Sequence, residues 1–276
     1  MSYGISIHIA LNKIDPAYYG DEGTLAGCVN DLKSMKKIAL KMKYNEVYTF
    51  INEQSTHAAI VKQIKQASMK LKAGDTLLLT YSGHGGSIHD NNKDESDGLD
   101  ETWCLYDRML VDDELGLLWS KFKKGVRIIM ASDSCHSGSV SRGVMTANGT
   151  IKEIEPVKRN RLFKNANKVY LKNKAMYDAE GTKNIKATDK IKATVILLSG
   201  CQDNQLSSDG DKNGLFTEML LKAWNGGKFK GNYAGLIQKM LQWMPRDQTP
   251  NFSRIGAANA TFEAYRRRRA AHRTRC

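Results

Sequence analysis

Short apolar runs alternate with segments of helical spacing along most of this chain. Strands are expected over 5–11, 46–51, 76–82, 126–132, 193–199 and 251–254. Helices are expected over 24–44, 56–71, 214–224 and 233–243, where apolar residues recur every three or four positions. The strands at 76–82, 126–132 and 193–199 are almost continuously apolar, which is typical of strands buried on both faces. The pattern therefore predicts an α/β fold with a mainly parallel sheet between helices.

Size and cysteine usage narrow the class of protein. With 276 residues and 41% hydrophobic content, the chain can bury one good core or at most two small ones. No apolar stretch approaches the length of a membrane span, and the apolar N-terminus lacks the basic lead and cleavage site of a signal peptide. Five cysteines without paired spacing favour a reducing compartment. These features predict a cytoplasmic protein without a membrane partner.

The net charge of +13 is concentrated in two segments. Residues 141–192 hold thirteen Lys and Arg against five Asp and Glu, and residues 264–276 hold six Arg and no acidic residue. Because the rest of the chain is almost neutral, the basic charge does not mark a structured nucleic-acid-binding face. Basic runs of this kind are more often solvated segments. Nucleic-acid binding through them is the weaker alternative.

Two polar, glycine-rich loops follow two of the apolar strands and carry the candidate chemistry. His84 lies in T-Y-S-G-H-G-G (80–86), and Cys135 lies in S-D-S-C-H-S-G-S (132–139). Active sites of open α/β sheets lie beyond the carboxyl ends of strands, and a thiol needs a base to be nucleophilic at neutral pH. A single His or Cys is more often structural, but complementary halves on two such loops indicate a catalytic pair. His136 is a competing base, although the neighbour of a nucleophile on an extended turn points the other way.

The motifs S-G-H-G-G and D-S-C-H-S-G resemble the histidine and cysteine motifs of metacaspases. These caspase-related peptidases have the caspase–haemoglobinase fold, and the resemblance is to prokaryotic or type I catalytic domains. Further matches are L-A-G-C-V-N-D (25–31), D-G-L-D-E-T-W (97–103), D-D-E-L (112–115) and S-G-C-Q-D-N-Q (199–205). The resemblance implies a caspase-like three-layer sandwich with a central, mostly parallel β-sheet flanked by helices on both faces. It divides the chain into a large segment (1–140), a basic variable linker (141–192), a small segment (193–263) and an Arg-rich tail (264–276).

The resemblance also implies a reaction, namely cysteine endopeptidase hydrolysis. His84 would promote attack by the Cys135 thiolate on a peptide carbonyl, and backbone N–H groups near Gly85 and Cys135 would hold the oxyanion. No third member of the catalytic group is apparent in the sequence. A dyad suffices because a thiol is already acidic.

Substrate preference follows from acidic positions in the same motifs. By the resemblance, Asp31, Ser82 and Cys28 belong to the primary specificity pocket, and Asp133 stands where caspases carry Gln. Two carboxylates in a narrow pocket favour Arg or Lys over Asp. In the alternative interpretation, Asp31 is a surface charge on a helix and Asp133 is a turn former.

Calcium is the one cofactor that the resemblance suggests. Asp97, Asp112 and Asp113 match an aspartate cluster that binds Ca²⁺ outside the active site in many metacaspases, and such hard oxygen ligands suit this ion. The family's fourth carboxylate falls near Arg142, so the cluster is incomplete. Calcium is expected to raise activity, and no organic cofactor is expected.

The basic linker would itself be a substrate for an enzyme that cuts after basic residues. Its composition offers little apolar surface to bury, which predicts the mobility that proteolysis requires. A tethered substrate is also present at high effective concentration. The candidate self-cleavage sites follow Arg159, Arg161, Lys164, Lys168, Lys172, Lys174, Lys183, Lys186 and Lys190. The expected protein is thus a monomer acting on proteins or peptides; the remaining alternative is a catalytically weak caspase-fold protein that binds partners.

Overall fold

A six-stranded sheet forms the centre of the molecule in the computed structural model, which describes residues 2–89, 99–134, 168–181, 191–200, 212–245 and 248–264. The strand order is β2-β1-β3-β7-β8-β9. The strands are β1 (Gly4–Ala10), β2 (Glu46–Ile51), β3 (Thr76–Ser82), β7 (Arg127–Asp133), β8 (Thr194–Ser199) and β9 (Asn251–Gly256). Every neighbouring pair is parallel except β8 with β9. The predicted sheet and all six of its strands are confirmed.

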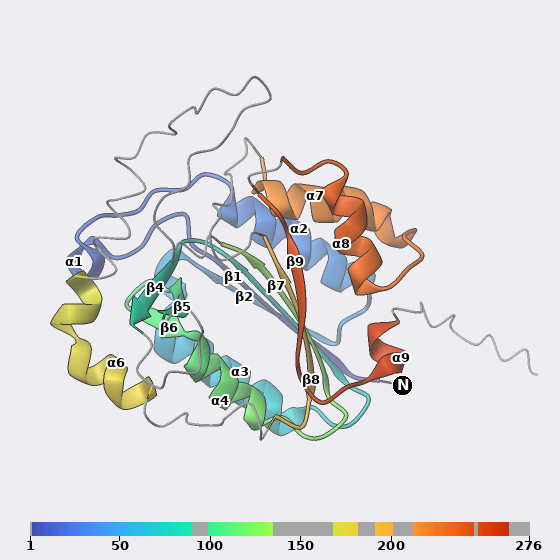
Figure 1. The fold of residues 1–276 in the computed structure, drawn as a ribbon, viewed down its shortest axis with the longest axis horizontal. Helices are drawn as coiled ribbons and strands as arrows, with labels where there is room; N and C mark the ends of the chain where they lie inside the picture. Colours follow the sequence, from blue (N-terminus) through green and yellow to red (C-terminus); the bar gives the residue numbers. More distant parts are fainter. Residues whose placement is uncertain are drawn as a thin grey trace, which may run out of the picture.

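Helices cover both faces of this sheet, as Figure 1 shows. One face carries α2 (Cys28–Lys41), α7 (Leu215–Trp224) and α8 (Tyr233–Leu241), and the other carries α3 (His57–Lys70) and α4 (Asp112–Ser120). The three-layer α/β architecture is therefore as predicted. Within the described ranges, no helix combines the length and the apolar character that a membrane crossing requires.

The continuously apolar strands are buried on both faces, for the reason that their sequences indicated. Leu77, Leu79 and Tyr81 of β3 belong to the core on the α3–α4 side. Leu78, between them, lines a cavity together with Met35 of α2 and Leu236 of α8 on the opposite side. Since successive side chains of a strand alternate between faces, two apolar layers require a run without polar interruptions.

A second, smaller sheet was not predicted. It contains β4 (Gly85–His89), β5 (Leu99–Cys104) and β6 (Met109–Val111), all antiparallel. These strands are short and carry many polar residues, so their hydrophobic pattern is weak. The helix α4 was not predicted either, although it covers part of one face of the central sheet. Outside the predicted linker, the other elements that were missed are short: α1 (Pro16–Tyr19), α9 (Ala260–Glu263) and the 3₁₀ turns η1 (Asn52–Gln54) and η4 (Asn225–Gly227).

Part of the predicted linker is folded. Residues 168–172 are helical, and α6 (Lys174–Gly181) follows directly. Val169, Tyr170 and Tyr177 are buried and belong to the core on the α3–α4 side. The expectation that this segment has little apolar surface to bury was therefore wrong for 168–181. Residues 141–167 and 182–190, and the Arg-rich tail beyond residue 264, lie outside the described residues.

Candidate active site

The two loops that carry the candidate catalytic residues leave the same edge of the sheet. β3 and β7 are adjacent parallel strands, and their last residues, Ser82 and Asp133, lie opposite each other. His84 is two residues beyond Ser82, and Cys135 is two residues beyond Asp133. The register therefore gives the two residues equivalent positions past neighbouring strand ends. Cys135 itself, like His136, lies outside the described residues.

The backbone of His84 is held from two sides. Its carbonyl oxygen accepts hydrogen bonds from the Tyr81 hydroxyl at 2.6 Å and from the Cys104 N–H at 2.9 Å. The Tyr81 ring in turn stacks on Trp103, with ring centroids 4.4 Å apart and planes within 6° of parallel. Tyr81 and Trp103 are both fully buried. His84, which follows the end of β3, is thus fixed by the second sheet.

The imidazole of His84 is oriented by Gly23, a residue that the sequence did not single out. The Nε2 atom lies 2.6 Å from the Gly23 carbonyl oxygen. Because a carbonyl can only accept, Nε2 carries the proton of the neutral ring, and Nδ1 is then the nitrogen that can take up another. Gly23 has a φ of +54°, and a Cβ there would lie 2.9 Å from Nε2. A glycine is required at this point for its conformation and for the close approach.

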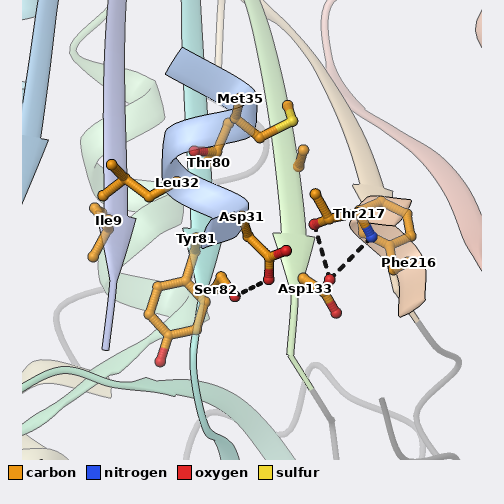
Figure 2. Close-up of a pocket in the computed structure, with 11 residues that line it drawn as sticks. Ile9, Asp31, Leu32, Met35, Thr80, Tyr81, Ser82, Asp133, Phe216 and Thr217 are labelled. Carbon is orange, nitrogen blue, oxygen red and sulfur yellow. Dashed lines mark hydrogen bonds between the residues drawn. The ribbon is translucent and has the colours of Figure 1, made fainter. Parts of the chain in front are cut away.

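Two buried carboxylates lie near the ends of β3 and β7. Asp31, in the first turn of α2, is 2% exposed, and Asp133, at the end of β7, is 7% exposed. Asp31 is therefore not a surface charge, and Asp133 is the last residue of a strand, so both parts of the alternative interpretation were wrong. The Ser82 hydroxyl donates to Asp31 Oδ2 at 2.7 Å. Figure 2 shows Asp31, Ser82 and Asp133 gathered between α2, β3 and β7.

The small segment supplies the other donors to these carboxylates. Asp31 Oδ1 accepts from the Asn213 side-chain amide at 2.8 Å and from the Gly214 N–H at 2.9 Å. Asp133 Oδ2 accepts from both the backbone N–H and the hydroxyl of Thr217, at 3.0 and 2.9 Å. The first turn of α7 therefore binds Asp133, where the positive end of the helix dipole favours a negative charge. Nothing in the local sequence marks these three residues as part of the site.

The two carboxylates differ in their readiness to ionise. Burial, followed by the charge of Asp133, raises the pKa of Asp31 from 3.8 to about 7, and the hydrogen bonds from Ser82, Asn213 and Gly214 only partly oppose this. Because the negative charge of Asp133 is one of the causes of this shift, Asp31 is the carboxyl that keeps its proton up to about pH 7. The cavity that they help to line holds about 10 Å³, close to the space for one water molecule.

The remaining predicted site residues are distributed around this centre. Cys28 is the first residue of α2, one turn before Asp31, and it packs with Ala10 and Leu32. Gly85 begins β4 directly after His84. Asp112 and Asp113 form the start of α4, whereas Asp97 lies outside the described residues. Among the residues that are described, no three His, Cys, Asp or Glu side chains form a group that could hold a metal ion.

The candidate self-cleavage sites fall into two groups. Lys168, Lys172 and Lys174 lie in the folded part of the linker. The other six lie outside the described residues: Arg159, Arg161, Lys164, Lys183, Lys186 and Lys190.

Comparison with known proteins agrees with this fold and this arrangement. Residues 13–260 match the family model described as the caspase domain. Metacaspase-1 of Schizosaccharomyces pombe is 31% identical over 240 residues, covering 75% of this chain and 56% of that protein. The chain spans about half the length of the curated metacaspases it matches.

Solved structures show the same relationship. A crystal structure of a protein from Geobacter sulfurreducens has a TM-score of 0.81 and 39% identity, covering 96% of this chain and 97% of that one. Caspase-1 from Spodoptera frugiperda has a TM-score of 0.55 at 11% identity, covering 91% and 86%, and shares the fold. The mostly parallel sheet between two layers of helices thus has the caspase fold. The chain belongs to the caspase-domain family of peptidases, and its relatives include metacaspases.

Proposed function

We propose that the chain is a cysteine endopeptidase that uses His84 and Cys135. The supporting observation is the register of β3 and β7: the last residues of these adjacent parallel strands, Ser82 and Asp133, lie opposite each other and precede His84 and Cys135 by two positions each. The hydrogen bond from His84 Nε2 to the Gly23 carbonyl adds to this, because it leaves Nδ1 as the basic atom of the ring. The Gly23 carbonyl then serves as the third member that the sequence did not reveal.

In the proposed reaction, His84 takes the proton from the Cys135 thiol, and the thiolate attacks the carbonyl carbon of the scissile peptide bond. Backbone N–H groups near Gly85 and Cys135 stabilise the negative charge on the carbonyl oxygen. The imidazolium then gives its proton to the leaving amine, and water hydrolyses the acyl-enzyme with His84 as base.

A thiol-alkylation assay tests this pair separately from substrate specificity. Iodoacetamide should modify Cys135 rapidly in the wild type and slowly in His84→Ala, because the neighbouring imidazole promotes the thiolate. Cys135→Ala should lack both this labelling and peptidase activity. His272→Ala is a control, since His272 belongs to the Arg-rich tail and to neither of the two motifs. Equal labelling of wild type and His84→Ala would contradict the pair, and labelling without peptidase activity would favour a partner-binding protein.

We further propose that the enzyme cuts after Arg or Lys, with Asp31 and Asp133 as the acidic pocket. Two buried carboxylates within reach of the same glycine support this: a Cβ at Gly214 would lie 2.4 Å from Asp133 Oδ2 and 3.1 Å from Asp31 Oδ2. A bound guanidinium or ammonium group would offset the electrostatic repulsion between the two ionised carboxylates. Peptides that differ only before the cut should be cleaved with Arg or Lys and not with Asp. Preferred cleavage after Asp would refute the assignment.

Self-cleavage in the linker is proposed for the sites outside 168–181. Lys168, Lys172 and Lys174 are in helical conformation next to buried residues, whereas a peptidase needs an extended segment. We therefore expect cuts after one or more of Arg159, Arg161, Lys164, Lys183, Lys186 and Lys190. Incubated wild-type protein should give fragments with these ends while Cys135→Ala stays whole. Cysteine-independent nicking would count against self-processing.

Calcium binding is proposed for the aspartates at the start of α4. β5 and β6 are antiparallel, with Thr102 opposite Val111, so the chain enters β5 at the end where Asp112 and Asp113 lie. Asp97 precedes β5 closely in the sequence and fits a shared set of oxygen ligands. A bound Ca²⁺ would supply charge that holds these carboxylates together. Millimolar calcium should then raise the melting temperature of the Cys135→Ala protein, independently of activity.

A further inference from the structure

The helix α6 comes from the predicted linker, yet its Tyr177 is one of the largest fully buried side chains among the described residues. The Tyr177 hydroxyl oxygen lies 2.7 Å from the hydroxyl of Tyr18 on α1. It also accepts a hydrogen bond from the backbone N–H of Met109 on β6, at 3.2 Å. One hydroxyl group thus joins α1 to the second sheet, and Figure 1 shows α6 lying against α1.

The ring of Tyr177 has its own support. The Arg108 guanidinium lies 5.4 Å from the ring centroid, a separation at which a cation is attracted to the face of an aromatic ring. Arg108 also pairs with the buried Glu114 of α4, and Glu114 accepts from His57 Nε2 of α3 at 2.6 Å. Tyr177 is therefore held by Arg108 and by Met109 of β6, and Arg108 is fixed in turn by Glu114 of α4; none of these residues belongs to the linker.

The helix that Tyr177 contacts leads directly to the loop that holds His84. α1 ends at Gly20, and Gly23, three residues further on, supplies the carbonyl oxygen that accepts from His84 Nε2. The loop is tied back to the start of α1 by the Ile14 N–H, which donates to the Glu22 carbonyl at 2.8 Å. The position of Gly23 therefore depends on where α1 sits.

The second sheet holds both α1 and His84. The Asp15 N–H donates to the Tyr106 carbonyl, and the Tyr19 hydroxyl donates to the Leu105 carbonyl, at 3.0 and 2.8 Å. The preceding residue, Cys104, holds the backbone of His84. The second sheet thus holds the backbone of His84, and the loop that follows α1 holds its imidazole through Gly23. Tyr177 spans these two elements from outside.

We propose that Tyr177 is a positioning residue for His84: the docked helix α6 clamps α1 to β6 and so fixes the Gly23 carbonyl that orients the imidazole. This inference rests on the proposed pairing of His84 with Cys135. The clamp is non-covalent, and the linker residue that makes its contacts, Tyr177, lies within the folded segment 168–181. It therefore stays in place after a cut on either side of this segment.

The clamp is tested by removing the two hydroxyl groups singly and together. Tyr177→Phe and Tyr18→Phe keep both rings, and Met176→Leu is a control in the same helix that removes no hydroxyl. Each tyrosine variant should lower kcat on an Arg peptide about threefold to tenfold with KM unchanged, as expected for the loss of one or two hydrogen bonds that act through His84. Each should also shift the pH profile of Cys135 alkylation by iodoacetamide. The double variant should match Tyr177→Phe alone, because both substitutions remove the same bond.

Other results would overturn the proposal. A wild-type alkylation profile in Tyr177→Phe, with a changed profile in His84→Ala, would show that the pair exists but the clamp does not position it. Additive losses in the double variant would show that the two hydroxyls act separately. An unchanged profile in His84→Ala would remove the catalytic pair and the clamp together. If Tyr177→Phe does not fold, Tyr18→Phe carries the same comparison.

Discussion

We expect the ionised form of Asp31 to destabilise the folded protein. The substitution Asp31→Asn tests this, because Asn cannot ionise. The pKa of this carboxyl is about 7 in the folded chain, against an ordinary value of 3.8, because burial and Asp133 both oppose its charge. Between these values the folded chain binds a proton that the unfolded chain has lost. Stability therefore falls as the pH rises from about 4 to about 7. The difference of about three pKa units corresponds to about 4 kcal/mol as an upper value.

Asp31→Asn removes this penalty and keeps the hydrogen bonds. The Asn oxygen can still accept from Asn213 and Gly214, and its amide can donate to Ser82, which accepts as well as donates. At pH 5, little more than one pH unit above 3.8, the variant should be more stable than the parent by only about 1.6 kcal/mol, because the penalty has just begun to build up. At pH 8.5 it should be more stable by up to about 4 kcal/mol, which for a chain of this length raises Tm by several degrees.

The measurement is a set of thermal melts in the Cys135→Ala background, which prevents self-cleavage. Asp75→Asn serves as the control: Asp75 accepts from the backbone N–H groups of Tyr3 and Lys72, so it should show no gain at high pH. The stabilised Asp31→Asn chain, with Cys135 restored, should cleave after Arg much more slowly than the wild type but still measurably, as expected where a functional charge costs stability. Equal destabilisation at both pH values would refute the reasoning, because Asp31 would then be a structural carboxylate.

Three further outcomes are expected. Cleavage after Arg should rise with pH through about 7, as Asp31 ionises, and kcat/KM profiles of Asp31→Asn should lack this rise. Gly23→Ala should lower kcat by at least tenfold because its Cβ would meet the His84 imidazole. Gly74→Ala is the control for backbone strain alone, since Gly74 has a φ of +88° and open space around the added Cβ. Equal losses of kcat in the two variants would contradict the proposed contact. Asp113→Asn should reduce the calcium-induced rise in melting temperature, and a full response would place the ion elsewhere.

Hydrophobic spacing was sufficient to predict the central sheet and its main helices. Strands such as 76–82 and 126–132 need apolar side chains on both faces, so their local sequence pattern is enough to predict a buried strand. The short strands around Gly85 and Met109 were missed because they gain their stability from pairing with each other and packing against α3 and α4. These contacts join residues that are distant in the sequence, so they produce no local hydrophobic periodicity.

The features of the candidate site can likewise be separated into those that the sequence predicted and those that only the structure showed. The sequence indicated that His84 and Cys135 follow two buried strands, and because parallel strands end at one edge of a sheet, both residues were expected at that edge. The adjacency of β3 and β7 within the sheet was decided by the tertiary structure. The sequence also supplied Asp31 and Asp133 through the motifs.

Only the tertiary structure decided what surrounds those residues. The Gly23 carbonyl lies 61 positions from His84 in the chain, and the Gly214 N–H lies 183 positions from Asp31. Tyr177 contacts Tyr18 across 159 positions. Each of these contacts uses a backbone group or a common side chain whose chemistry gives no signal by itself. Packing of the whole chain is what brings such groups within hydrogen-bonding distance, and that distance is not encoded in any local pattern.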